Sequence, residues 1–121
     1  MKTLIIDDDG DVLRVQYIKL TKAGHEVLFA QDGVKGAELA HTHKPELIIL
    51  ETELAQKNGL EIIREVKRSR KPAPMIIILS HQKSDEAIAA GFAAGADDYM
   101  TKPFSQHVLL ERIRVNAIRR Q

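Results

Sequence analysis

The chain has 121 residues, of which 44% are hydrophobic and 29% are charged, and its formal net charge is +1. This length supports one domain with a buried core and excludes two, so we expect a single domain over residues 1–121. The near-neutral charge does not favour direct binding to nucleic acid or to a membrane surface. The chain has no cysteine, and no apolar run approaches the ~20 residues of a membrane-spanning helix. These features exclude disulfide and thiol chemistry and predict a cytoplasmic protein.

Short apolar runs alternate along the chain with segments whose apolar residues recur at helical spacing. The apolar runs predict strands at 3–6, 25–30, 46–50, 75–79 and 98–101. The intervening and final segments predict helices at 11–24, 33–43, 59–69, 84–95 and 105–120. Five alternations of strand and helix predict an α/β domain with a doubly wound, five-stranded parallel sheet covered by helices on both faces.

The first predicted helix has a clear apolar face and a clear end. Leu13, Tyr17 and Leu20 are expected to share its buried face, because they recur at helical spacing. Gly24 stands where a left-handed residue ends a helix.

Charged and polar side chains follow most of the predicted strands. Ligand sites in open parallel sheets form at the carboxyl ends of strands, beside the point where strand order reverses. Those ends carry, in chain order, Asp7, Asp8, Asp9, Glu51, Ser80, Lys102 and Pro103. If the first and third strands are adjacent, the carboxylates converge, and their repulsion requires a bound cation, a protonated carboxyl group or a lysine partner. Such oxygen ligands suit Mg²⁺.

Four groups of residues stand in this order along essentially the whole chain: LIIDDD, PELIILE with NGLEII, IIILS and GADDYMTKPF. In their order and spacing they resemble the receiver domains of bacterial two-component response regulators. The last segment, with lysine before proline, is the most specific. The resemblance implies a flavodoxin-like (βα)5 fold with strand order 2-1-3-4-5 and a cis bond between Lys102 and Pro103. It also implies a signalling switch and not an enzyme.

The resemblance implies a metal site at four positions. The family's acidic pair falls on Asp7 and Asp8, its phosphoacceptor aspartate falls on Glu51, and its metal-contacting backbone carbonyl falls on Glu53. We expect any Mg²⁺ held there to bind weakly, or not at all, because Glu51 replaces aspartate.

The resemblance also implies three switch positions around the phosphoacceptor. The switch hydroxyl falls on Ser80, the switch aromatic on Tyr99 and the phosphoryl-contacting lysine on Lys102. Glutamate is one methylene longer than aspartate, so the Glu51 carboxylate reaches roughly 1.5 Å further. It is therefore misplaced for attack on a phosphodonor, and it lies close to where an aspartyl phosphate would put its oxygens. We expect a phosphorylation-independent domain, or one locked in an active-like state.

Other departures surround Glu51. Ala55 stands where proline is typical of the family, and His81 follows the switch hydroxyl, where its ring is expected to crowd the phosphoryl pocket. Three alternatives remain at this point. The site is vestigial and the domain only docks, or Glu51 is an engineered phosphomimic in a working receiver. A flavin or nucleotide binder of the same architecture is the third, which the acidic first loop disfavours.

The resemblance implies protein partners. They are a sensor histidine kinase or another signalling protein, and an effector domain if the chain is the N-terminal part of a longer regulator instead of a stand-alone receiver. A homodimer is expected to use the face that carries Asp97, Asp98, Glu111, Arg112 and Arg119. We expect this dimer to be weak, since the fourth helix lacks the basic residues of the winged-helix subgroup that dimerises there.

Overall fold

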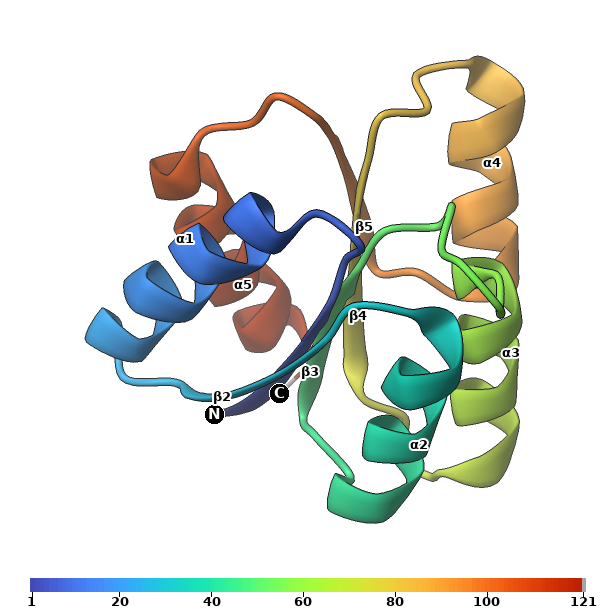
Figure 1. Cartoon of the computed structure of the whole chain (residues 1–121), viewed down its shortest axis with the longest axis horizontal. Helices are drawn as coiled ribbons and strands as arrows, with labels where there is room; N and C mark the ends of the chain where they lie inside the picture. Colours follow the sequence, from blue (N-terminus) through green and yellow to red (C-terminus); the bar gives the residue numbers. More distant parts are fainter. Residues whose placement is uncertain (121) are drawn as a thin grey trace.

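The computed structural model describes residues 1–120, in which strands and helices alternate (Figure 1). The strands are β1 (Lys2–Ile6), β2 (Glu26–Ala30), β3 (Leu47–Leu50), β4 (Met75–Ser80) and β5 (Asp98–Thr101). The helices are α1 (Gly10–Lys22), α2 (Gly33–His43), α3 (Gly59–Ser69), α4 (Asp85–Ala94) and α5 (Gln106–Arg119). Every predicted element is present, with ends that agree to within two residues.

The five strands form one parallel sheet in the order β2-β1-β3-β4-β5, which confirms the predicted doubly wound fold. Because β1 and β3 are neighbours, the strand order reverses between them. Ile6 pairs with Leu50 in their register. The next residues, Asp7 and Glu51, therefore leave the sheet side by side at its carboxyl edge.

The sheet separates two apolar layers, and its strands are apolar on both faces because helices cover both. Alternate residues, such as Ile48 and Ile76, point towards α2, α3 and α4, and the residues between them, such as Ile49 and Ile77, point towards α1 and α5 (Figure 1). All four side chains are at most 1% exposed. Within residues 1–120, none of the helices has the length and hydropathy to span a bilayer.

The predicted buried face of α1 was wrong at one position. Leu13 and Leu20 are buried as predicted, but Tyr17 is 44% exposed and packs edge-on against Phe29, with ring centroids 5.9 Å apart. The buried residue between the leucines is Gln16, at 1% exposure. Each helical residue turns by about 100°, so Gln16 and Tyr17 lie on opposite sides of the leucine stripe and only one of them faces the sheet. Gly24 follows the end of α1 with φ of 98°, as predicted.

A partly buried histidine lies under the amino ends of β1 and β2. The Nδ1 atom of His25 is 3.0 Å from the hydroxyl of Thr3, whose side chain is fully buried. Burial, followed by the charge of the N-terminal amine, lowers the pKa of His25. The folded chain therefore favours the neutral imidazole.

This lowered pKa makes folding stability depend on pH. The unfolded chain takes up a proton on His25 as the pH falls through about 6.5, whereas the folded chain resists it. The stabilisation is present above that pH and is lost below it. We expect the free energy of unfolding, measured in urea, to fall between about pH 7.5 and 5.5, and His25→Gln to remove part of the fall. An equal fall in the variant would contradict this role of His25.

Candidate functional site

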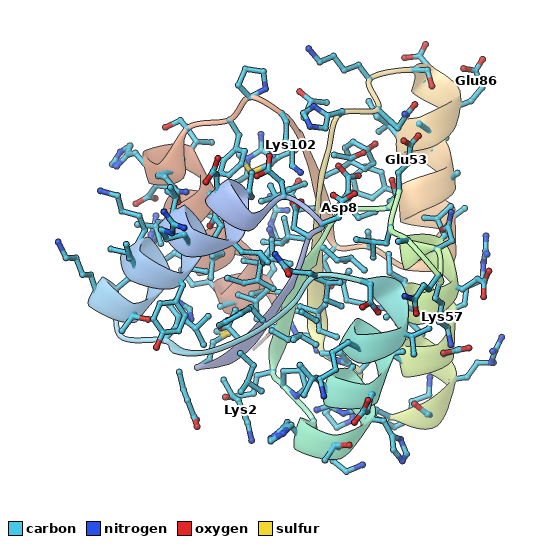
Figure 2. The ribbon with its side chains drawn as sticks, viewed as in Figure 1. Lys2, Asp8, Glu53, Lys57, Glu86 and Lys102 are labelled. Carbon is cyan, nitrogen blue, oxygen red and sulfur yellow. The ribbon has the colours of Figure 1, made fainter. Side chains whose placement is uncertain are left out.

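The charged residues predicted from the strand ends lie together at the carboxyl edge of the sheet. Figure 2 shows Asp8, Glu53 and Lys102 at this end of the molecule and Lys2 at the opposite end. Asp8, Glu53 and Lys102 lie in the loops after β1, β3 and β5, respectively. A parallel sheet brings these loops to one edge, because all of its strands run in the same direction.

A buried lysine joins the two central carboxylates. The Nζ atom of Lys102 lies 2.6 Å from Oδ2 of Asp7 and 3.3 Å from Oε1 of Glu51. The three side chains are between 3% and 5% exposed. Of the ways to relieve carboxylate repulsion considered above, the chain uses a lysine partner.

The second oxygen of Glu51 is held by the loop that follows it. Oε2 accepts a hydrogen bond from the backbone N–H of Thr52 at 2.7 Å and a longer one from the N–H of Glu53 at 3.4 Å. The hydroxyl of Thr52 lies 3.4 Å from the same oxygen. The carboxylate is thus fixed at both oxygens, one by a cation and one by its own loop.

Burial and charge pairing shift the pKa values of Asp7, Glu51 and Lys102 in opposite directions. Burial raises the pKa of Asp7, and the hydrogen bond from Lys102 offsets only part of this effect. Burial also acts to raise the pKa of Glu51, but the Ser80 hydroxyl, Lys102 and neighbouring backbone N–H groups outweigh it, so this pKa is lowered. Burial acts to lower the pKa of Lys102, but its two carboxylates outweigh it and raise this pKa. Of these two carboxylates, Glu51 is therefore the one that holds its negative charge more firmly.

A chain of hydrogen bonds connects this cluster to Tyr99. The hydroxyl oxygens of Thr52 and Ser80 lie 3.3 Å apart, and the backbone N–H of Gln82 donates to the Ser80 hydroxyl at 3.1 Å. The phenol of Tyr99 donates to the carbonyl of Gln82 at 2.8 Å. The Gln82 side-chain amide donates to the carboxylate of Glu53. Gln82 therefore ties the loop after β4 both to the loop after β3 and to β5.

Comparison with known proteins identifies the family. Residues 3–114 match the response regulator receiver domain. The chain belongs to this family. Receiver domains of response regulators act with histidine kinases and effector domains, and they generally bind Mg²⁺.

Three proteins show how similar this receiver is to other response regulators in sequence and in structure. It is 32% identical over 113 residues to the alkaline phosphatase synthesis transcriptional regulatory protein PhoP of Bacillus subtilis, a match that covers 93% of the receiver and 47% of PhoP. The BeF3-activated DrrB receiver domain is 34% identical, with a TM-score of 0.86 and 96% of each chain covered. A two-component response regulator from Clostridium difficile, 23% identical, shares the fold with a TM-score of 0.93 over 100% of this receiver and 98% of that chain. The receiver spans about half the length of PhoP.

Within residues 1–120, no group of three or more histidine, cysteine, aspartate or glutamate residues is placed to hold a metal ion. Asp8 is exposed. The contact predicted at Glu53 is through its backbone carbonyl, so the bond between its side chain and the Gln82 amide does not bear on it. Both oxygens of Asp7 accept hydrogen bonds from protein groups, as do both oxygens of Glu51. This donor set does not fit Mg²⁺ while Lys102 occupies the space between the carboxylates. The metal site of this receiver stays a prediction.

The acidic residues assigned to a dimer face have partners in their own chain. The carboxylate of Asp98 accepts from Nη1 of Arg112 at 2.8 Å and from the side-chain amide of Asn116 at 3.0 Å. Asp97 accepts the backbone N–H of Ile76 at 2.8 Å. These bonds fix β5 to α5 and to the start of β4.

Glu111, the remaining acidic residue of the predicted dimer face, also has a partner within the chain. Glu111 pairs with Arg114 one turn further along α5 at 2.9 Å, and Arg119 is exposed. The acidic charges predicted to bind a second copy therefore already form pairs within the receiver.

The neighbourhood of Ser80 was predicted in part. The peptide bond between Lys102 and Pro103 is cis, as predicted. His81 is exposed and borders, with Lys102 and Asp9, an open hollow beside the acidic cluster. Its predicted crowding of a phosphoryl group stays a prediction.

Two residues of the site were missed by sequence reasoning. Thr52 and Gln82 lie in the loops after β3 and β4, one residue after Glu51 and two after Ser80. Their place directly behind two predicted site residues was the available signal. Neither residue type is diagnostic alone, because threonine and glutamine are common in surface loops.

Proposed function

We propose that this chain is a signalling receiver in which Glu51 takes the phosphoacceptor position and holds the switch residues in an active-like arrangement without phosphorylation. One observation supports it most directly. The Glu51 carboxylate contacts Lys102 at 3.3 Å and, through Thr52, is linked to Ser80. These are the two groups that the family resemblance assigns to phosphoryl contact.

The chemistry of Glu51 disfavours phosphoryl transfer. Its Oε1 atom is paired with Lys102, and its Oε2 atom accepts the N–H of Thr52 at 2.7 Å. An attacking oxygen must give up one of these interactions and then meet the phosphodonor from a position roughly 1.5 Å further out than an aspartate oxygen. Errors of this size in placement cost about 10²-fold in rate. Phosphorylation of Glu51 is therefore inefficient.

The same carboxylate copies part of an aspartyl phosphate. A phosphoryl group adds about −1.5 to −2 charge and three acceptor oxygens, and a carboxylate supplies one charge and two oxygens. The lowered pKa of Glu51 keeps that charge in place. Tyr99, at 8% exposure, is held inward by its bond to the Gln82 carbonyl.

The proposed role of Glu51 has consequences for Mg²⁺ binding and for the partners of the domain. Mg²⁺ binding is weakened, because the ion would have to displace the Lys102 ammonium from Asp7, where the atoms are 2.6 Å apart. We propose that the domain is not an enzyme and acts through protein contacts, with a histidine kinase or another signalling protein and with an effector domain in a longer chain. It makes no direct contact with nucleic acid or membrane.

A homodimer through Asp97, Asp98, Glu111 and Arg119 is proposed to be weak. The internal pairing of Asp98 with Arg112 supports this, since an intermolecular pair would have to replace a bond that already exists. The apolar surface of α4 also offers few charges to a second copy.

The test is intact mass spectrometry after incubation with Mg²⁺ and acetyl phosphate. The native chain, Glu51→Asp and the control Glu53→Asp are compared. We expect a phosphoryl adduct on Glu51→Asp alone, formed about 10²-fold faster than any adduct on the native chain. The control carries the same chemical change two residues away and keeps Glu51.

The other outcomes separate the alternatives. A rapid, stoichiometric adduct on Glu51 in the native chain would refute the proposal and indicate a working receiver with an unusual acceptor. If neither the native chain nor Glu51→Asp is modified, the pocket has diverged further, and a docking module without switching is the better reading.

A further inference from the structure

Thr52 lies between the carboxylate of Glu51 and the hydroxyl of Ser80. Its Oγ1 atom is 3.4 Å from Oε2 of Glu51 and 3.3 Å from Oγ of Ser80. Thr52 is 8% exposed and Ser80 is fully buried. The Ser80 hydroxyl also acts directly on Glu51 by lowering its pKa, and the threonine hydroxyl adds a second, bridging contact between the two side chains.

The hydrogen bonds that link Gln82, Ser80, Thr52 and Glu51 can all be assigned the same direction of donation. The backbone N–H of Gln82 can only donate, so the Ser80 oxygen accepts from it. The Ser80 hydroxyl then has its proton free for Thr52, and the Thr52 hydroxyl has its own proton free for the carboxylate. Each hydroxyl donates once and accepts once, and the chain ends on the ionised Glu51. Hydrogen bonds aligned in this way polarise one another and strengthen together.

The series of hydrogen bonds that begins at Glu51 ends at Tyr99. Gln82 donates its N–H to Ser80 and accepts the phenol of Tyr99 on its carbonyl at 2.8 Å. The backbone N–H of Lys102 donates to the carbonyl of Ser80 at 2.8 Å, so the Ser80 backbone is fixed by a bond that does not involve its hydroxyl. The position of the Gln82 loop, and with it of the phenol, therefore depends on the Ser80 hydroxyl.

We infer that Thr52 is a positioning residue, whose hydroxyl couples Glu51 to Ser80 and thereby holds Tyr99 inward. This rests on the proposed function, since it gives the route by which Glu51 reaches the switch aromatic. A purely structural role for Thr52 would depend on its shape. Valine has nearly the same shape and no hydroxyl, so the two roles predict different results for Thr52→Val.

The chain provides a direct probe of Tyr99. It has two tyrosines and no tryptophan. Tyr17 is exposed and packs edge-on against Phe29, so Tyr17→Phe keeps the ring and leaves Tyr99 as the only tyrosine. Ring-¹³C-labelled tyrosine then gives NMR signals from Tyr99 alone, and acrylamide quenching of tyrosine fluorescence reports its exposure.

The variants are made in the Tyr17→Phe background. Thr52→Val is expected to shift the Tyr99 signal and to lower the ratio of inward to outward Tyr99 by about fivefold, which is the effect of losing one typical buried hydrogen bond. Thr52→Ser keeps a hydroxyl and should restore the parent signal. The matched control is Thr3→Val, which removes a buried hydroxyl at the opposite end of the sheet. It should leave the Tyr99 signal unchanged.

Two further variants separate failure of this inference from failure of the proposed function. If Glu51→Ala and Ser80→Ala move the Tyr99 signal and Thr52→Val does not, Thr52 is not the coupling group and this inference is overturned. If Glu51→Ala also leaves Tyr99 unchanged, the proposed function fails with it. Thr52→Ala gives a second test of the hydroxyl if the valine variant does not fold, and a parent-like Tyr99 signal in that variant overturns the inference equally.

Discussion

Lys102→Met is expected to lower the free energy of unfolding by about 3–5 kcal/mol. The substitution keeps most of the apolar stem and removes the charge that pairs with Asp7 at 2.6 Å and Glu51 at 3.3 Å. Both carboxylates would remain buried with no cation between them. Breaking a buried ion pair from one side is costly because an uncompensated charge is left behind. Urea unfolding with a fixed slope measures the loss.

The control for this prediction is Lys57→Met. Lys57 pairs with Glu65 at 2.7 Å, but these side chains are 23% and 43% exposed, so water screens the pair. We expect a loss below about 1 kcal/mol there. Adding Asp7→Asn to Lys102→Met should recover part of the loss, because one unpaired charge is removed. Similar small effects at Lys102 and Lys57 would mean that the carboxylates find another partner.

Gly33→Ala is expected to destabilise the fold by about 3 kcal/mol, at the upper end of the usual cost of overpacking. Gly33 is the first residue of α2, and an added Cβ would overlap the carbonyl oxygen of Lys57 in the loop after β3. Its N–H also donates to the carbonyl of Ala55 in the same loop at 3.0 Å. Because backbone lies on both sides of the contact, neither part can move aside cheaply.

Gly10→Ala is the matched control, since Gly10 is the first residue of α1. It is exposed, and the nearest atom to an added Cβ is the side-chain amide of Gln31 at 3.3 Å, which is the far end of a flexible side chain. Alanine favours a helix over glycine by up to about 1 kcal/mol, so we expect no loss or a small gain. Thermal unfolding of both variants compares the two helix starts. Equal effects at Gly10 and Gly33 would show that the approach of the loop to α2 is not tight.

The fold could be predicted from the sequence because its signals agree at several levels. The apolar runs of β1, β3 and β4 are buried on both faces, and such runs occur where helices cover a parallel sheet on each side. The buried face of α1 was predicted less well. Spacing alone gave Tyr17 the place that Gln16 takes, since a stripe defined by two leucines does not fix the rotation of the helix.

The site was predicted in outline and missed in detail. Asp7, Glu51 and Lys102 were expected to converge because each follows a strand end, and the register of β1 with β3 brings the two carboxylates together. Sequence reasoning could not choose among a metal, a proton and a lysine as the source of compensation, because this choice depends on atomic distances. Thr52 was missed for the same reason, since its role depends on two contacts of 3.3 and 3.4 Å.

The bond between Lys102 and Asp7 joins residues that are 95 positions apart in the chain. Asp7 and Glu51 come from the first half of the sequence, and their compensating charge arrives only with the last strand. A fragment that ends before β5 would have to bury two carboxylates with no cation, or leave the ends of β1 and β3 in water. We therefore expect neither part of the chain to reach its native state alone, because the cluster couples the formation of the first and last strands.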